Sequence, residues 1–487
     1  MYSRAKVFGT VVGACTSIYI VDDIYWYQVI QRSLRAFGLA GFTIVNYKFF
    51  WTPETASEIN LRVARAVTDC CLENEGLYVK IGQAICSMAA VLPPEYTESL
   101  SRLLDRAKTY EFEIIEKIIR EELGEGVIID LDPNPVGSAS LAQVHKGVYA
   151  STGEVVAVKV QKPNVSVQAK YDLAMYRFLV RMLEWTFEIP LSWSVGFTCD
   201  HFMDELDFRL EAKNSELTRS QLETKFHNIL YVPKIIASTQ KVLIAEWIPD
   251  TVMISDVKGL KERGFNSKAV VLDATRIFGH QIFHTGHIHC DPHPGNLLVR
   301  KGPTGLHQIV LIDHGLYVDL PEKLRKEYAA LWVAMSPPAN KKVVEEICAS
   351  WGIGSIELFQ TIVRAASSGG KRDPALENIH LAAKEANRKN NARGMNNIVK
   401  ENLKKLLQDT SKFPKELILV GRCMNYIRAA NWTHGAPIDR VAVLAESARE
   451  ANQLETGSQR GWLVRIGSGI LSYIPGGSPY QQEVKVG

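Results

Sequence analysis

The sequence predicts an α+β protein with a small β-rich lobe between a helical N-terminal extension and a large helical lobe. Two hairpin patterns lead to this prediction. Residues 140–161 contain two β-rich runs separated by a Ser-Thr-Gly turn, inside an otherwise helical chain. Residues 296–315 contain two more strand-like runs around Gly-Pro-Thr-Gly, within the mostly helical region that follows Asp256.

The composition is that of an ordinary globular chain. Of the 487 residues, 46% are hydrophobic and 22% are charged, which excludes a disordered protein. The 56 Lys and Arg against 53 Asp and Glu give a net charge of only +3, so we expect no nucleic-acid partner. The 8 cysteines are scattered and form no C-x-x-C pair, which indicates reduced thiols and neither a disulfide framework nor a zinc knuckle.

The first predicted segment, residues 1–51, has a basic and acid-poor start. Arg4 and Lys6 precede an apolar run at 7–21, which is shorter than the roughly 18 residues that a membrane span requires. A second apolar run at 36–51 contains a lysine. This pattern is typical of an organelle-targeting segment or a membrane anchor, so we expect membrane contact through the N-terminus. The alternative is an apolar helix packed on the domain.

Apolar residues at three- and four-residue spacing predict helices over most of the next predicted unit, residues 52–130. One helical stretch covers 54–92, a second restarts after two prolines at 93–94, and a third ends at Gly124.

The predicted β-rich lobe, residues 131–255, contains the first hairpin. Helical stretches are expected at 167–188 and 198–226, and short strands at 231–236 and 241–248. The large helical lobe is assigned to 256–487.

The segment His-Cys-Asp-Pro-His-Pro-Gly-Asn at 289–296 has the spacing of a protein-kinase-type catalytic loop, H-x-D-x-x-x-x-N. In that chemistry a carboxylate, here Asp291, sits beside the acceptor group, and an amide, here Asn296, reaches a magnesium ion on the phosphates. The histidines at 287, 289 and 293 could instead hold zinc, but no further ligand pair accompanies them. We therefore expect His289 to brace the loop.

Three further residues of this chemistry occur in the required order. Asp313 and Gly315 follow the second hairpin as a metal-binding carboxylate and its glycine do in kinases, although His314 replaces the usual phenylalanine. Lys159 in Val-Ala-Val-Lys is placed to hold phosphates. Glu211, with Glu205 as an alternative, is the expected ion-pair partner of Lys159. The set predicts a protein kinase-like bilobal fold.

Two features depart from ordinary protein kinases. The glycine-rich loop is replaced by a segment with one glycine, so the expected phosphate contacts are Gly137, Ser138, Ala139 and Ser140. Glu246 and Ile248, which end a predicted strand, complete the expected nucleotide site. After the Asp-His-Gly sequence the chain enters a helix at once, without A-P-E or an activation segment, which argues against a protein substrate.

The chain resembles the UbiB/ABC1/aarF-domain family of atypical kinases over roughly residues 55–335. Lys-Ile-Gly-Gln at 80–83 resembles the family's K-x-G-Q motif, Glu-Leu-Asp at 205–207 its E-x-D motif, and 289–296 its catalytic loop. Asp-His-Gly-Leu-Tyr and Leu-Val-Arg-Lys are similar to the mitochondrial aarF domain-containing kinase 1 branch. The loop at 137–140 is not the family's run of alanines, which leaves nucleotide preference open.

The resemblance implies that the K-x-G-Q extension covers the site where a peptide would bind. Lys80 and Gln83 should then face the nucleotide site, near Glu205 and Asp207, in a regulatory role. The residues agree, because a lysine on an apolar helix is costly to bury without a partner. The implied cofactors are ATP or ADP with Mg²⁺.

The implied setting is the mitochondrial inner membrane, with a role in lipid or coenzyme Q homeostasis or membrane organisation. Two hypotheses remain open. One is a phosphotransferase or ATPase that acts on an unknown small molecule, lipid or protein. The other is a scaffold or regulator whose nucleotide site is only structural.

Overall fold

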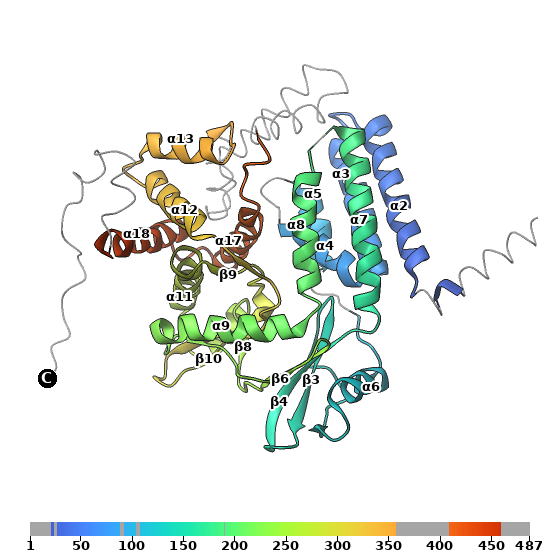
Figure 1. Cartoon of the computed structure of the whole chain (residues 1–487), viewed down its shortest axis with the longest axis vertical. Coiled ribbons are helices and arrows are strands. Elements are labelled where there is room, and N and C mark those ends of the chain that lie inside the picture. The colour runs from blue at the N-terminus through green and yellow to red at the C-terminus, as the bar shows by residue number, and fades with distance from the viewer. Residues whose placement is uncertain are drawn as a thin grey trace, which may run out of the picture.

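The computed structural model describes residues 21–23, 27–87, 92–103, 108–188, 190–356 and 409–458. A β-rich lobe, a layer of long helices and a second helical lobe meet around the predicted catalytic loop (Figure 1). Most of the apolar run predicted at 7–21 lies outside the described residues. Among the described helices, none is long and apolar enough to span a membrane.

The β-rich lobe is built on a sheet of strand order β1-β3-β4-β7-β6, with β2 paired to β3. The strands are β1 (Ile128–Ile129), β2 (Gly137–Ser138), β3 (Ala142–Tyr149), β4 (Glu154–Gln161), β6 (Ile235–Ser238) and β7 (Val242–Glu246). Antiparallel pairing of β3 with β4 confirms the hairpin predicted at 140–161.

Side chains of β4 alternate between the two faces of the sheet, and this alternation decides where Lys159 points. Val156, Val158 and Val160 are fully buried and pack in one cluster with α6 (Phe112–Leu123), which covers that face of the sheet (Figure 1). Because successive residues of a strand point to opposite faces, Lys159 projects away from α6, toward the large lobe.

The helical extension consists of α2 (Val29–Val45), the π-helix η1 (Asn46–Phe50), α3 (Ala56–Asn74), α4 (Gly76–Ser87), α5 (Pro94–Leu100) and η2 (Ser101–Leu103). The single helical stretch predicted at 54–92 is divided, because Glu75 and Gly76 have positive φ values of 55° and 54°. A Cβ on Gly82 would overlap Leu103 and lie 3.1 Å from the Cys71 sulfur, so Gly82 permits α4 to lie close to its neighbours.

Three helices follow the first hairpin: α7 (Val165–Phe187), α8 (Val195–Asp204) and α9 (Phe208–Phe226), with the short η3 (Ser192–Ser194) before α8. The helical stretch predicted at 198–226 is divided into α8 and α9. The carboxylate of Asp207 accepts a hydrogen bond from the backbone N–H of Arg209 at 3.0 Å and caps the start of α9. Helix α9 runs across the molecule between the β-rich sheet and the second lobe (Figure 1).

The second lobe contains two small sheets, β5-β11-β10-β8 and β12-β9. The strands are β5 (Leu230–Tyr231), β8 (Val252–Met253), β9 (His287–His289), β10 (Leu297–Lys301), β11 (His307–Leu311) and β12 (Tyr317–Asp319). Pairing of β10 with β11 confirms the hairpin predicted around Gly-Pro-Thr-Gly.

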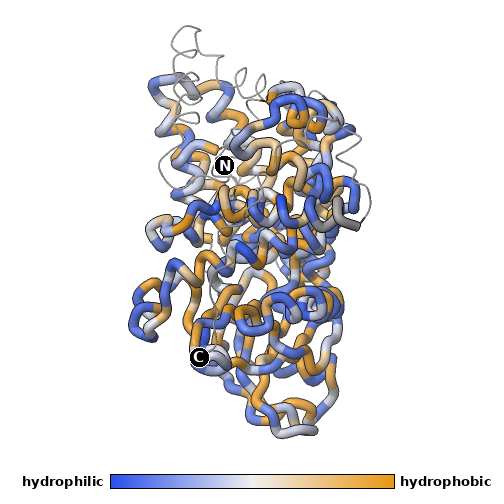
Figure 2. The backbone as a smooth tube through the Cα atoms, turned by 90° about the vertical axis from the view of Figure 1, so that its left-hand side faces the viewer, coloured by the Kyte–Doolittle hydropathy of each residue, from blue (hydrophilic) through white to orange (hydrophobic). Residues whose placement is uncertain are grey.

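The helices of this lobe enclose the largest apolar core, which includes the fully buried Phe278, Phe283 and Trp332. They are α10 (Val257–Glu262), α11 (Ser267–His280), η4 (Gln281–Thr285), η5 (Pro294–Asn296), α12 (Glu322–Met335), α13 (Lys341–Ser350), α17 (Glu416–Thr433) and α18 (Arg440–Ser458). Apolar and polar stretches alternate along the chain, as expected for helices with one buried face (Figure 2).

Helix α2 packs on α7, although all of α2 lies within residues 1–51, which the sequence predicted to be a separate N-terminal segment. The guanidinium of Arg32 forms a buried ion pair with Asp172 of α7 and also donates to the Asn74 carbonyl of α3. Both charged side chains are about 4% exposed. This contact joins α2 and α3 of the extension to α7.

We expect Arg32→Met to lower the free energy of unfolding by about 3–5 kcal/mol, because it leaves Asp172 buried without its cation. Denaturant unfolding measures the effect. The exposed Arg62, which pairs with Glu58 at 2.6 Å, is the control, and Arg62→Met should change stability by less than about 1 kcal/mol. If the two substitutions change the free energy of unfolding equally, the buried Arg32–Asp172 pair does not have the stabilising role expected of it.

Candidate active site

The predicted lysine–glutamate pair is present. The Lys159 ammonium donates to both carboxylate oxygens of Glu211, at 2.6 and 2.9 Å, and to Oδ2 of Asp313 at 3.0 Å. Burial alone would lower the pKa of Lys159, but Asp313 and Glu211 raise it above its ordinary value. The three residues come from β4, α9 and the end of the second hairpin, so this cluster joins the two lobes.

His289 braces the catalytic loop. Its Nδ1 accepts the backbone N–H of Asp291 at 3.0 Å, and its Nε2 donates to the Asp313 carbonyl at 2.8 Å. Burial lowers the pKa of His289 to about 4, so the ring is neutral at physiological pH and can accept and donate at once. Among the described residues, no group of three His, Cys, Asp or Glu could hold a metal ion, so the zinc alternative finds no support there.

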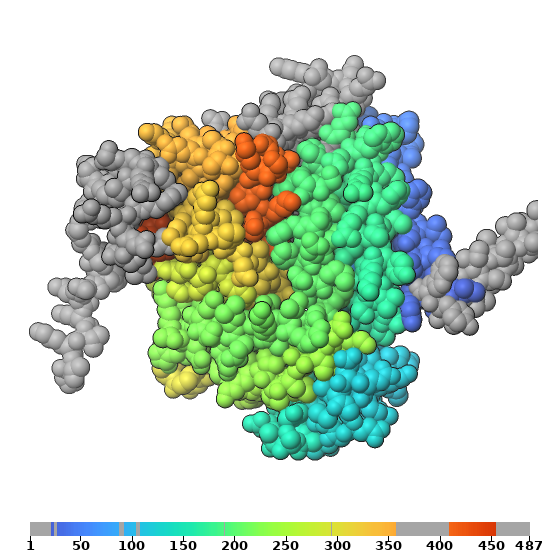
Figure 3. Space-filling view, in the orientation of Figure 1, coloured from blue at the N-terminus to red at the C-terminus, as the bar shows by residue number. Residues whose placement is uncertain are grey.

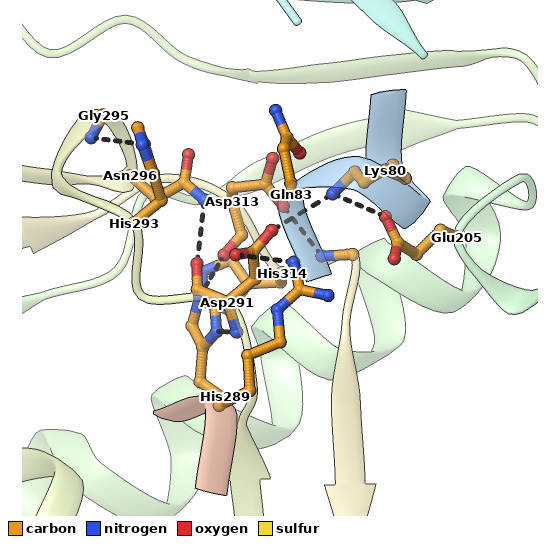
Figure 4. A network of polar contacts seen from close by, with 12 residues as sticks. Lys80, Gln83, Glu205, His289, Asp291, His293, Gly295, Asn296, Asp313 and His314 are labelled. Carbon is orange, nitrogen blue, oxygen red and sulfur yellow. Dashed lines mark hydrogen bonds and ion pairs between the residues drawn. The ribbon is translucent and has the colours of Figure 1, made fainter. Parts of the chain in front are cut away.

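Asn296 and Asp313 present the oxygen ligands that magnesium prefers. The Asn296 amide nitrogen donates to the Asp291 carbonyl at 3.0 Å, and so its amide oxygen points away from the loop backbone (Figure 4). Asp313 Oδ1 accepts the Gly315 N–H at 2.9 Å. Burial would raise the pKa of Asp313, but Lys159 and Lys80 hold it below its ordinary value and keep it anionic. A carboxylate and an amide oxygen fit Mg²⁺ bridged to phosphates.

Hydrogen bonds hold the predicted nucleotide loop, residues 137–140, to Lys108 before it and to Lys162 after it in the sequence. Ser138 donates its hydroxyl to the Lys108 carbonyl at 2.9 Å, and Lys162 donates to the Ala139 carbonyl at 2.5 Å. Gly137 is open, with no atom within 4 Å of a Cβ placed on it, whereas Ser140 is buried.

Sequence reasoning missed Lys162. This residue is 4% exposed, and burial lowers the pKa of its ammonium to about 8. It lines a cavity of about 380 Å³ between α3, α4 and the loop, together with Ser140 and Lys108. Its sequence signal was its position three residues after Lys159, directly after the end of β4.

Glu246 and Ile248 lie where β7 leaves the sheet. The Glu246 carboxylate accepts from the Tyr231 hydroxyl at 2.6 Å and from the Lys234 N–H at 3.3 Å, which fixes the strand end. Ile248 is buried. The Glu246 carboxylate is thus occupied by protein partners, and the nucleotide contact of these two residues stays a prediction.

Lys80 of α4 lies between two carboxylates, one from each side (Figure 4). Its ammonium is 2.8 Å from Glu205 Oε2 and 3.1 Å from Asp291 Oδ2. Burial would lower the pKa of Lys80, but Glu205 and Asp291 raise it above its ordinary value. The K-x-G-Q helix thus reaches the predicted catalytic carboxylate directly, a contact that the sequence did not specify.

Asp207 and Gln83 do not make the contacts with the nucleotide site that the family resemblance implies. Asp207 does not join Lys80, because it caps α9 and pairs with Arg209 at 2.6 Å. Gln83 donates its amide to the Leu103 carbonyl at 3.0 Å, within the extension. Of the E-x-D pair, only the glutamate is an ion-pair partner of Lys80.

The most consequential residue that the sequence reasoning missed is Arg422 of α17. Its guanidinium lies 3.0 Å from Asp291 Oδ1, at an angle that makes an ion pair but no aligned hydrogen bond. The side chain is 5% exposed and lies 5.9 Å from the Tyr426 ring, which in turn packs against His293. An arginine inside an apolar helical run was the available signal, since burial requires a partner.

Lys80 and Arg422 together set the charge of Asp291. Burial would raise the pKa of this carboxyl, but Arg422 and then Lys80 hold it well below its ordinary value. Asp291 is therefore anionic, and each of its oxygens faces a cation from a different part of the chain.

The comparisons with known proteins agree with this geometry. The family model of the ABC1 atypical kinase-like domain matches residues 102–347. An ABC1 family protein of Schizosaccharomyces pombe is 35% identical over 91% of this chain and 83% of its own length. The chain belongs to the ABC1 atypical kinase-like family. Its predicted kinase-like α+β fold is thereby confirmed.

Other family members are similar over a shorter part. AarF domain-containing protein kinase 1 of Gallus gallus is 34% identical over 64% of this chain and 60% of its own length. Among solved structures, that of Mycobacterium tuberculosis Rv3197 with erythromycin is 22% identical, with a TM-score of 0.44, and covers 78% of this chain and 97% of that one. Arg422 lies outside the matched family domain.

We expect Arg422→Leu to lower the free energy of unfolding by about 3–5 kcal/mol, because Asp291 loses one of its two cations in a buried site. Chemical denaturation measures the loss. The exposed Arg449 of α18 provides the control, and Arg449→Leu should stay within about 0.5 kcal/mol of wild type. If the Arg422→Leu protein is as stable as wild type, Lys80 alone is sufficient to compensate the buried charge of Asp291.

Proposed function

We propose that this protein binds Mg-ATP or Mg-ADP and acts as an atypical phosphotransferase or ATPase. The observation that carries the proposal is the contact of Lys159 with both Glu211 and Asp313, across the interface of the lobes. It supports a lysine held for phosphates beside a carboxylate that can bind magnesium. Family membership supports the same reading.

Each residue has a proposed task. Lys159 would bind phosphate oxygens, and Glu211 would hold that ammonium in place. Asp313 and Asn296 would hold Mg²⁺, which neutralises the developing charge when it is bound. Asp291 would orient the acceptor, and His289 would fix the backbone of Asp291.

The substrate is proposed to be a small molecule or lipid, with a protein as the weaker candidate. A protein is the weaker candidate because no activation segment stands between the Asp-His-Gly sequence and α12. Lys80 and Arg422 both contact Asp291, so any acceptor hydroxyl meets a carboxylate that already faces two cations. The helix that carries Lys80 must therefore move before transfer to an acceptor. Hydrolysis of nucleotide would need only a water molecule.

The cellular setting is proposed to be mitochondrial and associated with the inner membrane, in lipid or coenzyme Q homeostasis or membrane organisation. The basic, acid-poor N-terminal sequence and the resemblance described above support this setting.

Lys159→Met should weaken Mg-nucleotide binding by about tenfold or more, because a charge-assisted contact to phosphate is lost. Thermal shift and calorimetric titration with Mg-ATP and Mg-ADP measure this. The exposed Lys117 of α6 is the control, and Lys117→Met should bind as wild type does. If the wild-type protein binds neither nucleotide, the proposed function is wrong.

A catalysis-independent scaffold is the second candidate, and the double ion pair on Asp291 favours it. Asp313→Asn distinguishes the two, because it removes the metal-binding charge and keeps the side-chain shape. In cells that lack the protein, this variant should fail to restore function if turnover is required. Full rescue by a variant shown not to turn over nucleotide would favour the scaffold.

A further inference from the structure

The extension and α7 together carry an exposed apolar face that the predicted active site does not use. We call it the aromatic face and define it by the exposed large apolar residues of α2, η1 and α7. Its members are Leu34, Phe37, Phe42, Val45, Phe49, Phe50, Val167, Tyr171, Phe178 and Trp185. Trp185 is 84% exposed and Phe49 is 78% exposed, which is unusual for side chains of this size.

The two helices present one continuous surface because they run parallel, side by side. Gln168 donates to the Tyr27 carbonyl, and Arg32 donates to Asp172. The paired residues are 141 and 140 positions apart in the sequence, and such a nearly constant offset means that the two helices run in the same direction. The rings of Phe37 and Phe178 stack at 6.4 Å with nearly the same separation. The exposed Phe178 of α7 therefore lies directly beside the exposed Phe37 of α2, and the other exposed residues of the two helices lie above and below this pair. Figure 3 shows α2 and α7 as neighbours along one edge of the molecule.

The charges on this face are of one sign. The exposed charged residues of α2, η1 and α7 are Lys48, Lys170, Arg177 and Arg181. None of the exposed residues of these three elements is acidic, and the first exposed acid, Glu188, comes just beyond the end of α7. Lys48 extends over the Phe187 ring at 5.5 Å, with its stem along apolar surface.

We propose that the aromatic face is a membrane-docking surface that lies in the plane of an anionic bilayer. Exposed Phe, Trp and Leu side chains would enter the boundary between headgroups and acyl chains. The surrounding Lys and Arg side chains would reach anionic headgroups, and Trp185 and Tyr171 have the amphipathic rings that favour this depth. The exposed charges of this face are all basic, which favours an anionic lipid surface over an ordinary protein partner, whose contact would be expected to include both signs of charge.

The experiment is flotation of the full-length protein with vesicles of phosphatidylcholine alone and with added phosphatidylglycerol. Binding should require the anionic lipid and weaken at high salt. The double substitution Phe178→Ser with Trp185→Ser should weaken binding at least about tenfold, because two insertion side chains are lost. Arg177→Glu with Arg181→Glu should weaken binding to anionic vesicles by more than about tenfold.

Matched controls lie in the second lobe. Leu306 is 68% exposed, and Lys258 is an exposed lysine of α10. Leu306→Ser and Lys258→Glu should leave vesicle binding unchanged. Mg-nucleotide binding by all of these variants should equal that of wild type, so a failure of the docking surface is distinct from a failure of the proposed function.

Three outcomes would overturn the proposal. One is the absence of binding to either kind of vesicle. Another is binding that the aromatic-face variants do not weaken, which would assign membrane contact to other residues, such as the apolar run at 7–21. The third is a dimer in solution that Phe178→Ser with Trp185→Ser dissociates, which would mean that a second copy covers this face.

Discussion

The arrangement of the predicted active site depends on the charge balance of one buried carboxylate. Asp291 lies between Lys80 of the extension and Arg422 of the C-terminal helices, and a burial of this extent would otherwise favour the neutral acid. Removal of either cation leaves charge uncompensated in a region of low dielectric. The catalytic loop, the extension and α17 are therefore mutually dependent, although they are far apart in sequence.

This dependence bears on chemistry as well as stability. A carboxylate with both oxygens facing cations is held anionic and oriented, but it is not free to accept a proton from an incoming hydroxyl. Lys80 also has Glu205 at 2.8 Å, so its charge would stay neutralised if it left Asp291. Arg422 has no comparable second carboxylate in hydrogen-bonding distance within the described residues. Of the two cations beside Asp291, only Lys80 therefore has a second carboxylate partner among the described residues.

Much of the site could be predicted because strand alternation and motif order constrain it. Lys159 on an alternating strand must face away from the buried valines. Glu211 and Asp313 follow Lys159 in the chain order of the kinase motifs, and the kinase-like fold brings residues in that order into contact. Arg422 could not be placed from local patterns, because its partner is 131 residues away and only the tertiary fold joins them. The division of 198–226 was missed for a different reason. Asp207 has two possible uses, as a cap or as an ion-pair partner, and periodicity does not distinguish them.

The position of Arg422 has a consequence for what counts as the functional unit of this chain. Every motif of the kinase-like domain lies before α17, so a protein that ended after α13 would retain all of them. It would nevertheless lack the guanidinium beside Asp291, and α11 and α12 would lose the helices that pack on them. A C-terminal truncation should then behave as a loss of the active site, even though it removes no recognised motif.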